Sequence, residues 1–103
     1  KLKEVGLDYV CVTSGGIVPK TNIKFKAGYQ VFLAKKIKKE SKILVKTTGM
    51  IQNIKHAEKI ILKKSADVIS FGRKFISSPH WLIKELKKKK HKVNIPNQYK
   101  RCF

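Results

Sequence analysis

The chain has 103 residues, of which 25 are lysine or arginine and 6 are aspartate or glutamate, and its formal net charge is +19. This length suits one small domain, and a hydrophobic fraction of 42% separates the chain from disordered sequences. No run approaches the ~20 consecutive apolar residues that a membrane span needs, and the first residues lack the hydrophobic region of a signal peptide.

The positive charge comes almost entirely from lysine, because only Arg73 and Arg101 are arginine. Proteins that read nucleic acid rely on arginine for bidentate contacts and stacking. The lysines are spread along every expected helix, which favours a solvated surface over a specific nucleic-acid partner. A small basic nucleic-acid-binding protein is the alternative, and it predicts an affinity that collapses with salt.

The two cysteines, Cys11 and Cys102, are far apart and form neither a CxxC motif nor a cysteine–histidine metal spacing. Cys11 lies in an apolar run and is expected to be a small buried side chain. We therefore expect no metal site and a reducing, cytoplasmic setting.

The first third of the chain predicts a strand followed by a helix. Residues 1–7 predict the end of an earlier helix that Gly6 closes, and the first residue, lysine rather than methionine, indicates a piece of a longer protein. Residues 8–13 predict a strand that the Ser-Gly-Gly turn at 14–16 ends. Residues 29–41 predict a helix with lysines on its outer face and an apolar stripe formed by Tyr29, Phe32, Leu33 and Ile37.

The middle of the chain repeats this strand–helix unit. Residues 43–48 predict a second strand, ended by Gly49, and residues 66–71 predict a third, ended by Gly72. Between them, residues 53–64 predict a helix with Asn53 as N-cap and with an apolar stripe of Ile54, Ala57, Ile60 and Ile61.

The last third predicts one more helix and a tail. Ser78 and Pro79 indicate a helix start, and the apolar side of that helix contains Trp81, Leu82 and Leu86. The lysines at 87–90 are its expected exposed end. Residues 93–103 are expected to be irregular, since Pro96 opposes regular structure.

Strands that alternate with amphipathic helices predict an α/β fold with a parallel sheet and right-handed crossovers. The strands are apolar at nearly every position, as expected when both faces are covered. No linker divides residues 1–103, which therefore form one domain with a tail at 93–103. The sheet is a slice of an open doubly wound fold or of a closed barrel. A slice leaves two bare edges and one open face, so we expect no free-standing function.

Function in parallel α/β sheets lies beyond the carboxyl ends of the strands, here at residues 14–16, 49–51 and 72–74. Glycine lets backbone N–H groups approach an anion, and Arg73 adds a bidentate charge suited to phosphate. The glycines at 15 and 16 are explained by the turn alone. Gly72 with Arg73, and Gly49 one unit earlier, predict phosphate binding, because barrels often use the loops after strands 7 and 8 for this purpose.

Six motifs follow one another along essentially the whole chain: DYVCVTSGGIVP at 8–19, AGYQ at 27–30, TGMI at 48–51, ADVISFGRKF at 66–75, SPHW at 78–81 and PNQYKR at 96–101. Each is weak alone, but the ordered set is specific. It resembles the last third of the Old Yellow Enzyme family, and most closely its branch of bacterial NADPH dehydrogenases and xenobiotic reductases. The resemblance implies a C-terminal fragment, about strands 6–8, of a (β/α)₈ TIM barrel.

The resemblance also implies a cofactor and its site. Family members hold FMN non-covalently, take reducing equivalents from NADPH or NADH and pass them to activated alkenes or related small electrophiles. Gly72 and Arg73 match the family's phosphate-binding pair, and Gly49 and Met50 match the loop that lies against the same phosphate. Arg101 matches an arginine that reaches across a dimer interface, which implies a homo-oligomer, although the ending Cys102-Phe103 departs from the family's small residue followed by tryptophan.

The family's catalytic groups match no residue of this chain and would lie upstream of Lys1, so the missing N-terminal part of the barrel is an implied partner and the chain alone is expected to be inactive. His56, His80 and His91 are expected to be surface or packing residues, and Tyr9 and Tyr29 to pack. Tyr99 is expected to line the dimer contact or to anchor the tail. Another phosphate-binding FMN or sugar-phosphate barrel is the alternative within the same fold.

Overall fold

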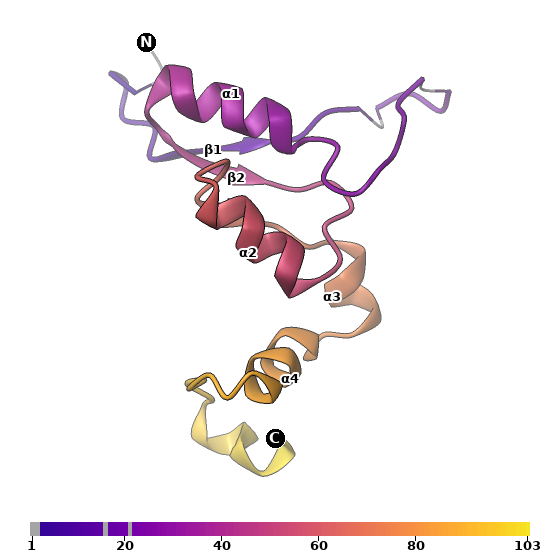
Figure 1. The fold of residues 1–103 in the computed structure, drawn as a ribbon, viewed down its shortest axis with the longest axis vertical. Helices are drawn as coiled ribbons and strands as arrows, with labels where there is room; N and C mark the ends of the chain where they lie inside the picture. Colours follow the sequence, from indigo (N-terminus) through magenta and orange to yellow (C-terminus); the bar gives the residue numbers. More distant parts are fainter. Residues whose placement is uncertain (1–2, 16, 21) are drawn as a thin grey trace. The chain divides into compact units, whose positions relative to one another are not determined.

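A computed structural model describes residues 3–15, 17–20 and 22–103 (Figure 1). The chain divides into two compact units, Lys1–Gly72 and Arg73–Phe103. The first contains the sheet and two helices, and the second contains short helices alone.

The sheet of the first unit is three-stranded and parallel, in the order β1-β2-β3. Its strands are β1 (Tyr9–Val12), β2 (Leu44–Thr47) and β3 (Val68–Ile69). Helix α1 (Val31–Ser41) joins β1 to β2, and helix α2 (Ile54–Leu62) joins β2 to β3. The predicted alternation and the parallel sheet are confirmed, with β3 shorter than expected.

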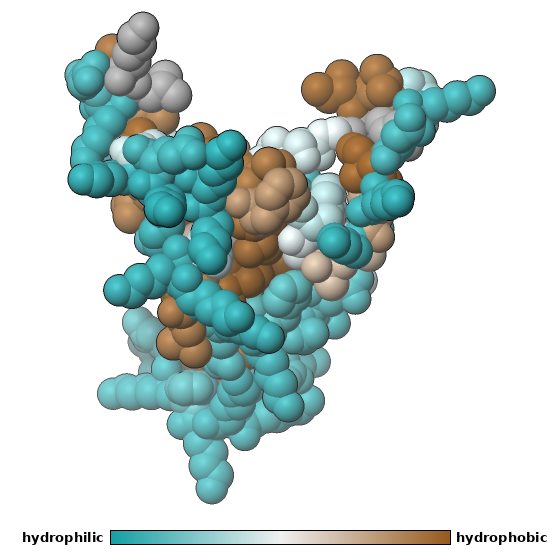
Figure 2. Space-filling model, turned by 45° about the horizontal axis from the view of Figure 1, so that its top comes forward, coloured by the Kyte–Doolittle hydropathy of each residue, from teal (hydrophilic) through white to brown (hydrophobic). Residues whose placement is uncertain are grey.

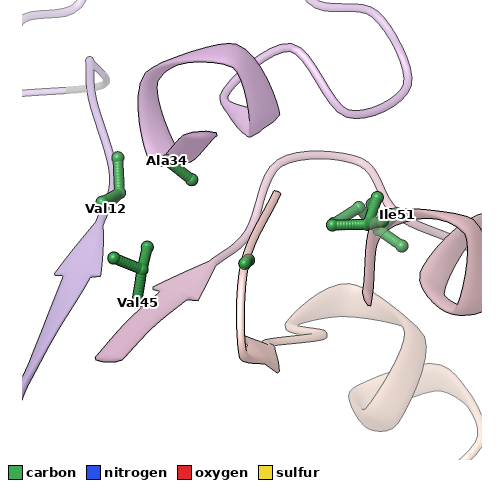
Figure 3. Packing of buried hydrophobic residues seen from close by; sticks show 6 residues of the cluster. Val12, Ala34, Val45 and Ile51 are labelled. Carbon is green, nitrogen blue, oxygen red and sulfur yellow. The ribbon is translucent and has the colours of Figure 1, made fainter. Parts of the chain in front are cut away.

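One face of the sheet carries the core. Figure 3 shows Val12 of β1 and Val45 of β2 close to Ala34 of α1. Ile60 of α2 belongs to the same buried cluster, as does Ile51 from the loop after β2. Both connecting helices therefore contribute to the core on the same side of the strands, since the alternate strand residues point the other way.

The opposite face is open in the described part of the chain. Tyr9, Leu44 and Val68 are 51%, 58% and 48% exposed, and the amine of Lys46 lies 5.5 Å from the centroid of the Tyr9 ring. The prediction that Cys11 is buried is wrong, because strand alternation places its thiol on this open face. The apolar strand sequences therefore reflect one covered face and one that these residues leave uncovered.

The helices of the first unit begin and pack as their local sequences dictate, with two exceptions. The Asn53 side chain caps α2 by accepting a hydrogen bond of 2.8 Å from the His56 backbone N–H, as predicted. Phe32 is 68% exposed, because the inward stripe of α1 runs through Val31, Ala34 and Ile37, and Phe32 lies about 100° away from Val31. Ile61 is likewise 39% exposed on α2.

The predicted helix end at residues 1–7 is a turn in its described part, where the Gly6 N–H donates to the Lys3 carbonyl over 3.2 Å. Lys1 and Leu2 lie outside the described residues.

The second unit contains α3 (Arg73–Ser77), α4 (Trp81–Lys88) and the 3-10 helix η1 (Asn97–Cys102). The sequence did not predict α3. It also placed the start of α4 too early: His80 occupies the N-cap, and the Ser78 carbonyl accepts from the Trp81 N–H over 3.1 Å in a preceding turn.

Trp81 is the buried residue of α4, with 5% of its surface exposed, and its ring centroid lies 6.1 Å from that of Phe75. Residues 93–96 of the tail have no regular structure, as predicted, but residues 97–102 form η1. Pro96 precedes this helix with a φ of −53°, a value compatible with a helix start. The lysines at 87–90 are exposed, as expected.

Figure 2 shows that most of the visible surface is hydrophilic, with hydrophobic side chains exposed in patches. None of the helices that the structure describes is long and apolar enough to cross a membrane. Among the described residues, no group of three or more histidine, cysteine, aspartate or glutamate side chains could hold a metal ion.

Candidate functional site

The turn at residues 27–30 contacts the loops that follow β1 and β2. It precedes α1, and its Gly28 N–H donates to the Gly49 carbonyl over 2.8 Å. On its other side, a Cβ at Gly28 would lie 2.9 Å from the His56 ring of α2. His56 therefore has the packing role expected of it, against a backbone that leaves no room for a side chain.

The loop that follows β2 has a constrained backbone. Gly49 has a φ of +106°, and a Cβ there would lie 3.0 Å from the Tyr29 ring and 3.3 Å from Cγ of Gln30. Met50 follows with a φ of +53°, in the left-handed region that costs a residue other than glycine roughly 1–3 kcal/mol. Ile51, which is 4% exposed, then anchors the loop in the core. The surrounding residues therefore hold a backbone conformation that the loop alone would not favour.

Gln30 is the residue at this edge that sequence reasoning missed. It is 1% exposed, and its Nε2 donates to the Ser14 carbonyl over 3.0 Å and to the Tyr29 hydroxyl over 2.8 Å. Its Oε1 is buried and has no hydrogen-bond partner in the described part of the chain. The available signal was its place at the end of the AGYQ motif at 27–30.

Gly72 follows β3 as Gly49 follows β2, one register position further along: counting on from the pair Thr47 and Ile69, Gly72 is level with Met50. The Ser70 N–H donates to the Thr47 carbonyl over 2.8 Å, so the pairing of β3 with β2 continues past the last residue of β3. A Cβ at Gly72 would meet nothing within 4 Å, so its backbone is accessible.

Arg73 begins the second unit. It is the first residue of α3, so the prediction of a loop across 72–74 is wrong. Its side chain is exposed, and no ion pair to it is found among the residues that the structure describes. The guanidinium is therefore available to an anion.

The remaining candidates are on the surface or in packing roles. Arg101 is exposed in η1, and Gly15 is exposed in the loop after β1, while Gly16 lies outside the described residues. The His80 ring packs against Phe103 in a T-shaped arrangement, with 5.3 Å between centroids, and His91 is exposed. Tyr29 packs against Phe25 at 5.4 Å, whereas Tyr9 and Tyr99 are about half exposed.

The carboxylates with shifted pKa values are elsewhere in the fold. A hydrogen bond of 2.6 Å from the Lys38 amine, and a second of 2.9 Å from the Val45 N–H, lower the pKa of Asp67. Asp67 precedes β3, at the amino end of the sheet. The hydrogen bond from Lys88 lowers the pKa of Glu85 within α4. Asp67 links elements of the first unit, Glu85 makes an exposed pair within α4, and neither lies in the glycine loops.

Comparison with known proteins then shows the family. The model of the NADH:flavin oxidoreductase / NADH oxidase family matches residues 3–92. The chain belongs to this family. The match confirms the resemblance to the Old Yellow Enzyme family that the ordered motifs carry.

Individual relatives agree. The chain is 32% identical over 97 residues to an NADPH dehydrogenase of Clostridium acetobutylicum, covering 94% of the chain and 28% of that protein. It is 35% identical over 101 residues to an NADPH dehydrogenase of Geobacillus thermodenitrificans (98% and 29%), and 34% identical over 102 residues to one of Bacillus pumilus (99% and 30%). The chain thus spans less than a third of the length of these relatives.

Proposed function

We propose that this chain supplies the FMN-phosphate end of a flavin oxidoreductase, with Gly49, Met50, Gly72 and Arg73 as the phosphate-binding residues. The observation that carries the proposal is the pair of glycines that follow the neighbouring strands β2 and β3 within one register position of each other. The family match supports a flavin as the ligand.

The chemistry of these residues fits a phosphate. The backbone at Gly72 is accessible, the backbone at Gly49 and Met50 is held in a fixed conformation, and the exposed Arg73 directly follows Gly72 in the chain. Backbone N–H groups at glycine turns bind anions, and arginine adds a charge-assisted bidentate pair. No described carboxylate forms an ion pair with Arg73 that a phosphate would have to displace.

We further propose that the sheet is about strands 6–8 of a TIM barrel. In such a barrel the helices form an outer ring and the other strand face points into the interior. The joint contribution of α1 and α2 to one core, and the open face that carries Tyr9, Leu44 and Val68, agree with this arrangement. A doubly wound fold would instead place helices on both faces.

The remaining barrel strands, which the chain lacks relative to its relatives, would then be its partner. Bound FMN would supply hydride transfer between NADPH or NADH and a small electrophile of the activated-alkene type. This chain would contribute to binding and orienting FMN, with no catalytic residue of its own.

We also propose that Arg101 acts at an interface between copies of the whole enzyme. We further propose that the enzyme is cytoplasmic, as the two free cysteines of this chain favour.

The test uses a restored barrel, in which this chain replaces the matching segment of the Clostridium acetobutylicum NADPH dehydrogenase. Arg73→Ala should weaken FMN binding about ten- to a hundred-fold, because a charge-assisted hydrogen bond contributes roughly 1.5–3 kcal/mol. Riboflavin lacks the phosphate, so its affinity should hardly change. Fluorescence quenching measures both ligands.

The control is Lys39→Ala, which removes one exposed positive charge from α1 and should alter neither affinity. Equal losses of FMN and riboflavin binding in Arg73→Ala would mean that Arg73 is structural. No loss of either would mean that the phosphate binds elsewhere, and the proposal would fail.

A further inference from the structure

The buried Gln30 side chain lies where the loops after β1 and β2 meet. Its amide nitrogen holds the Ser14 carbonyl at 3.0 Å, although 16 residues separate the two in sequence. The same nitrogen donates to the Tyr29 hydroxyl, and both Tyr29 and Gln30 pack against the Gly49 backbone. One side chain therefore contacts both loops at this edge of the sheet.

The loop after β2 needs such support. Gly49 and Met50 both have positive φ angles. This conformation is sterically strained at Met50, because its Cβ approaches the backbone. The Tyr29 ring and the Gln30 Cγ occupy the space beside Gly49, and the Gly28 N–H fixes the Gly49 carbonyl. If Tyr29 and Gln30 moved away, the Gly49-Met50 backbone could leave its positive-φ conformation.

The unpartnered Oε1 indicates what the amide is for. A buried acceptor without a donor destabilises the fold. An apolar side chain of the same length would remove this unpaired oxygen, but it would also lose the two hydrogen bonds that Nε2 donates. The amide therefore adds little to the stability of the core, whereas its two hydrogen bonds hold the Ser14 carbonyl and the Tyr29 hydroxyl in place.

We propose that Gln30 is a positioning residue for the phosphate-binding loop: it orients the Gly49-Met50 backbone toward the cofactor phosphate without touching the cofactor. This inference rests on the proposed function, because it requires the phosphate to bind at that loop.

The decisive variant is Gln30→Met, which keeps the length of the side chain and removes its polar atoms. In the restored barrel it should weaken FMN binding on the order of tenfold, the effect of losing about one well-placed hydrogen bond, and leave riboflavin binding nearly unchanged. Tyr29→Phe removes only the hydroxyl that Gln30 contacts and should produce a smaller loss of the same kind.

The matched control is Val45→Ala, which truncates a fully buried core residue of β2. It should lower the thermal midpoint more than Gln30→Met does and leave the ratio of FMN to riboflavin affinity unchanged. A purely structural role of Gln30 predicts instead that both variants lower the midpoint together and that neither changes the ratio.

A second measurement uses the 103-residue chain itself and needs no cofactor. Hydrogen exchange followed by mass spectrometry should show faster exchange in Gln30→Met for peptides that contain residues 28 and 49–51, with the Asn53-capped start of α2 unaffected. Unchanged exchange at residues 28 and 49–51 would overturn the inference.

The two proposals fail differently. If Arg73→Ala loses FMN selectively and Gln30→Met does not, the positioning role is overturned and the proposed function stands. If Gln30→Met accelerates exchange but neither variant discriminates FMN from riboflavin, the phosphate binds elsewhere and both proposals are overturned.

Discussion

Asp67→Asn should destabilise the first unit through a single ionised group. The carboxylate accepts from the Lys38 amine at 2.6 Å and from the Val45 N–H at 2.9 Å, and it thereby ties α1 and β2 to the start of β3. Asparagine has one acceptor oxygen in place of two and no charge, so at least one of these bonds is lost.

The expected loss lies between two limits. A hydrogen bond to a charged group contributes about 1.5–3 kcal/mol, whereas an exposed ion pair contributes about 0–1 kcal/mol. The side chains of Lys38 and Asp67 are 24% and 26% exposed, so solvent screens the pair in part. We therefore expect Asp67→Asn to lower the free energy of unfolding by about 1–2 kcal/mol at neutral pH.

The pH dependence gives the sharper test. Because the fold lowers the pKa of Asp67, its contribution is fully present above the ordinary carboxyl pKa and is lost as the pH falls through the lower, folded value. The stability difference between Asp67→Asn and the unaltered chain should thus shrink progressively as the pH is lowered below the ordinary carboxyl pKa of about 4.

Urea unfolding at low micromolar concentration, followed by circular dichroism, measures these differences. Glu85→Gln is the control, because it removes a lysine–glutamate pair of 2.9 Å that is exposed on α4 and should change stability little. Equal losses in Asp67→Asn and Glu85→Gln, or an Asp67→Asn effect that persists undiminished in acid, would refute the reasoning.

Two further predictions concern the chain without added barrel strands. It should not oxidise NADPH or NADH with a cyclic enone faster than free FMN does, because the proposed function gives it no catalytic residue, and turnover above that background would contradict the proposed fragment role. It should also self-associate through the open face that carries Tyr9, Leu44 and Val68, since exposed apolar sheet surfaces and free edges associate. Sedimentation that shows a compact monomer would argue for a self-sufficient domain.

Much of the fold was predictable because it depends on near neighbours in the sequence. The Asn53 cap acts on His56, three residues away, and glycine at 49 meets a backbone requirement within its own turn. One error has a physical cause of the same short range. The helix start was placed at Ser78 because serine and proline suit that position in general, yet the chain there makes a turn and His80 precedes the helix.

The sequence by itself determined the strand–helix alternation, the parallel sheet, the glycine turns and, through the ordered motifs, the family. Tertiary structure alone decided which strand face is covered, so that Cys11 is exposed and Val12 buried, although both lie in the same apolar run. It also decided two contacts between residues distant in sequence. Gln30 lies 16 positions from its partner Ser14, and Asp67 lies 29 positions from its partner Lys38. Periodicity reports which residues of one element share a side, but only the packing of elements against each other sets which side is buried and which distant polar groups meet there.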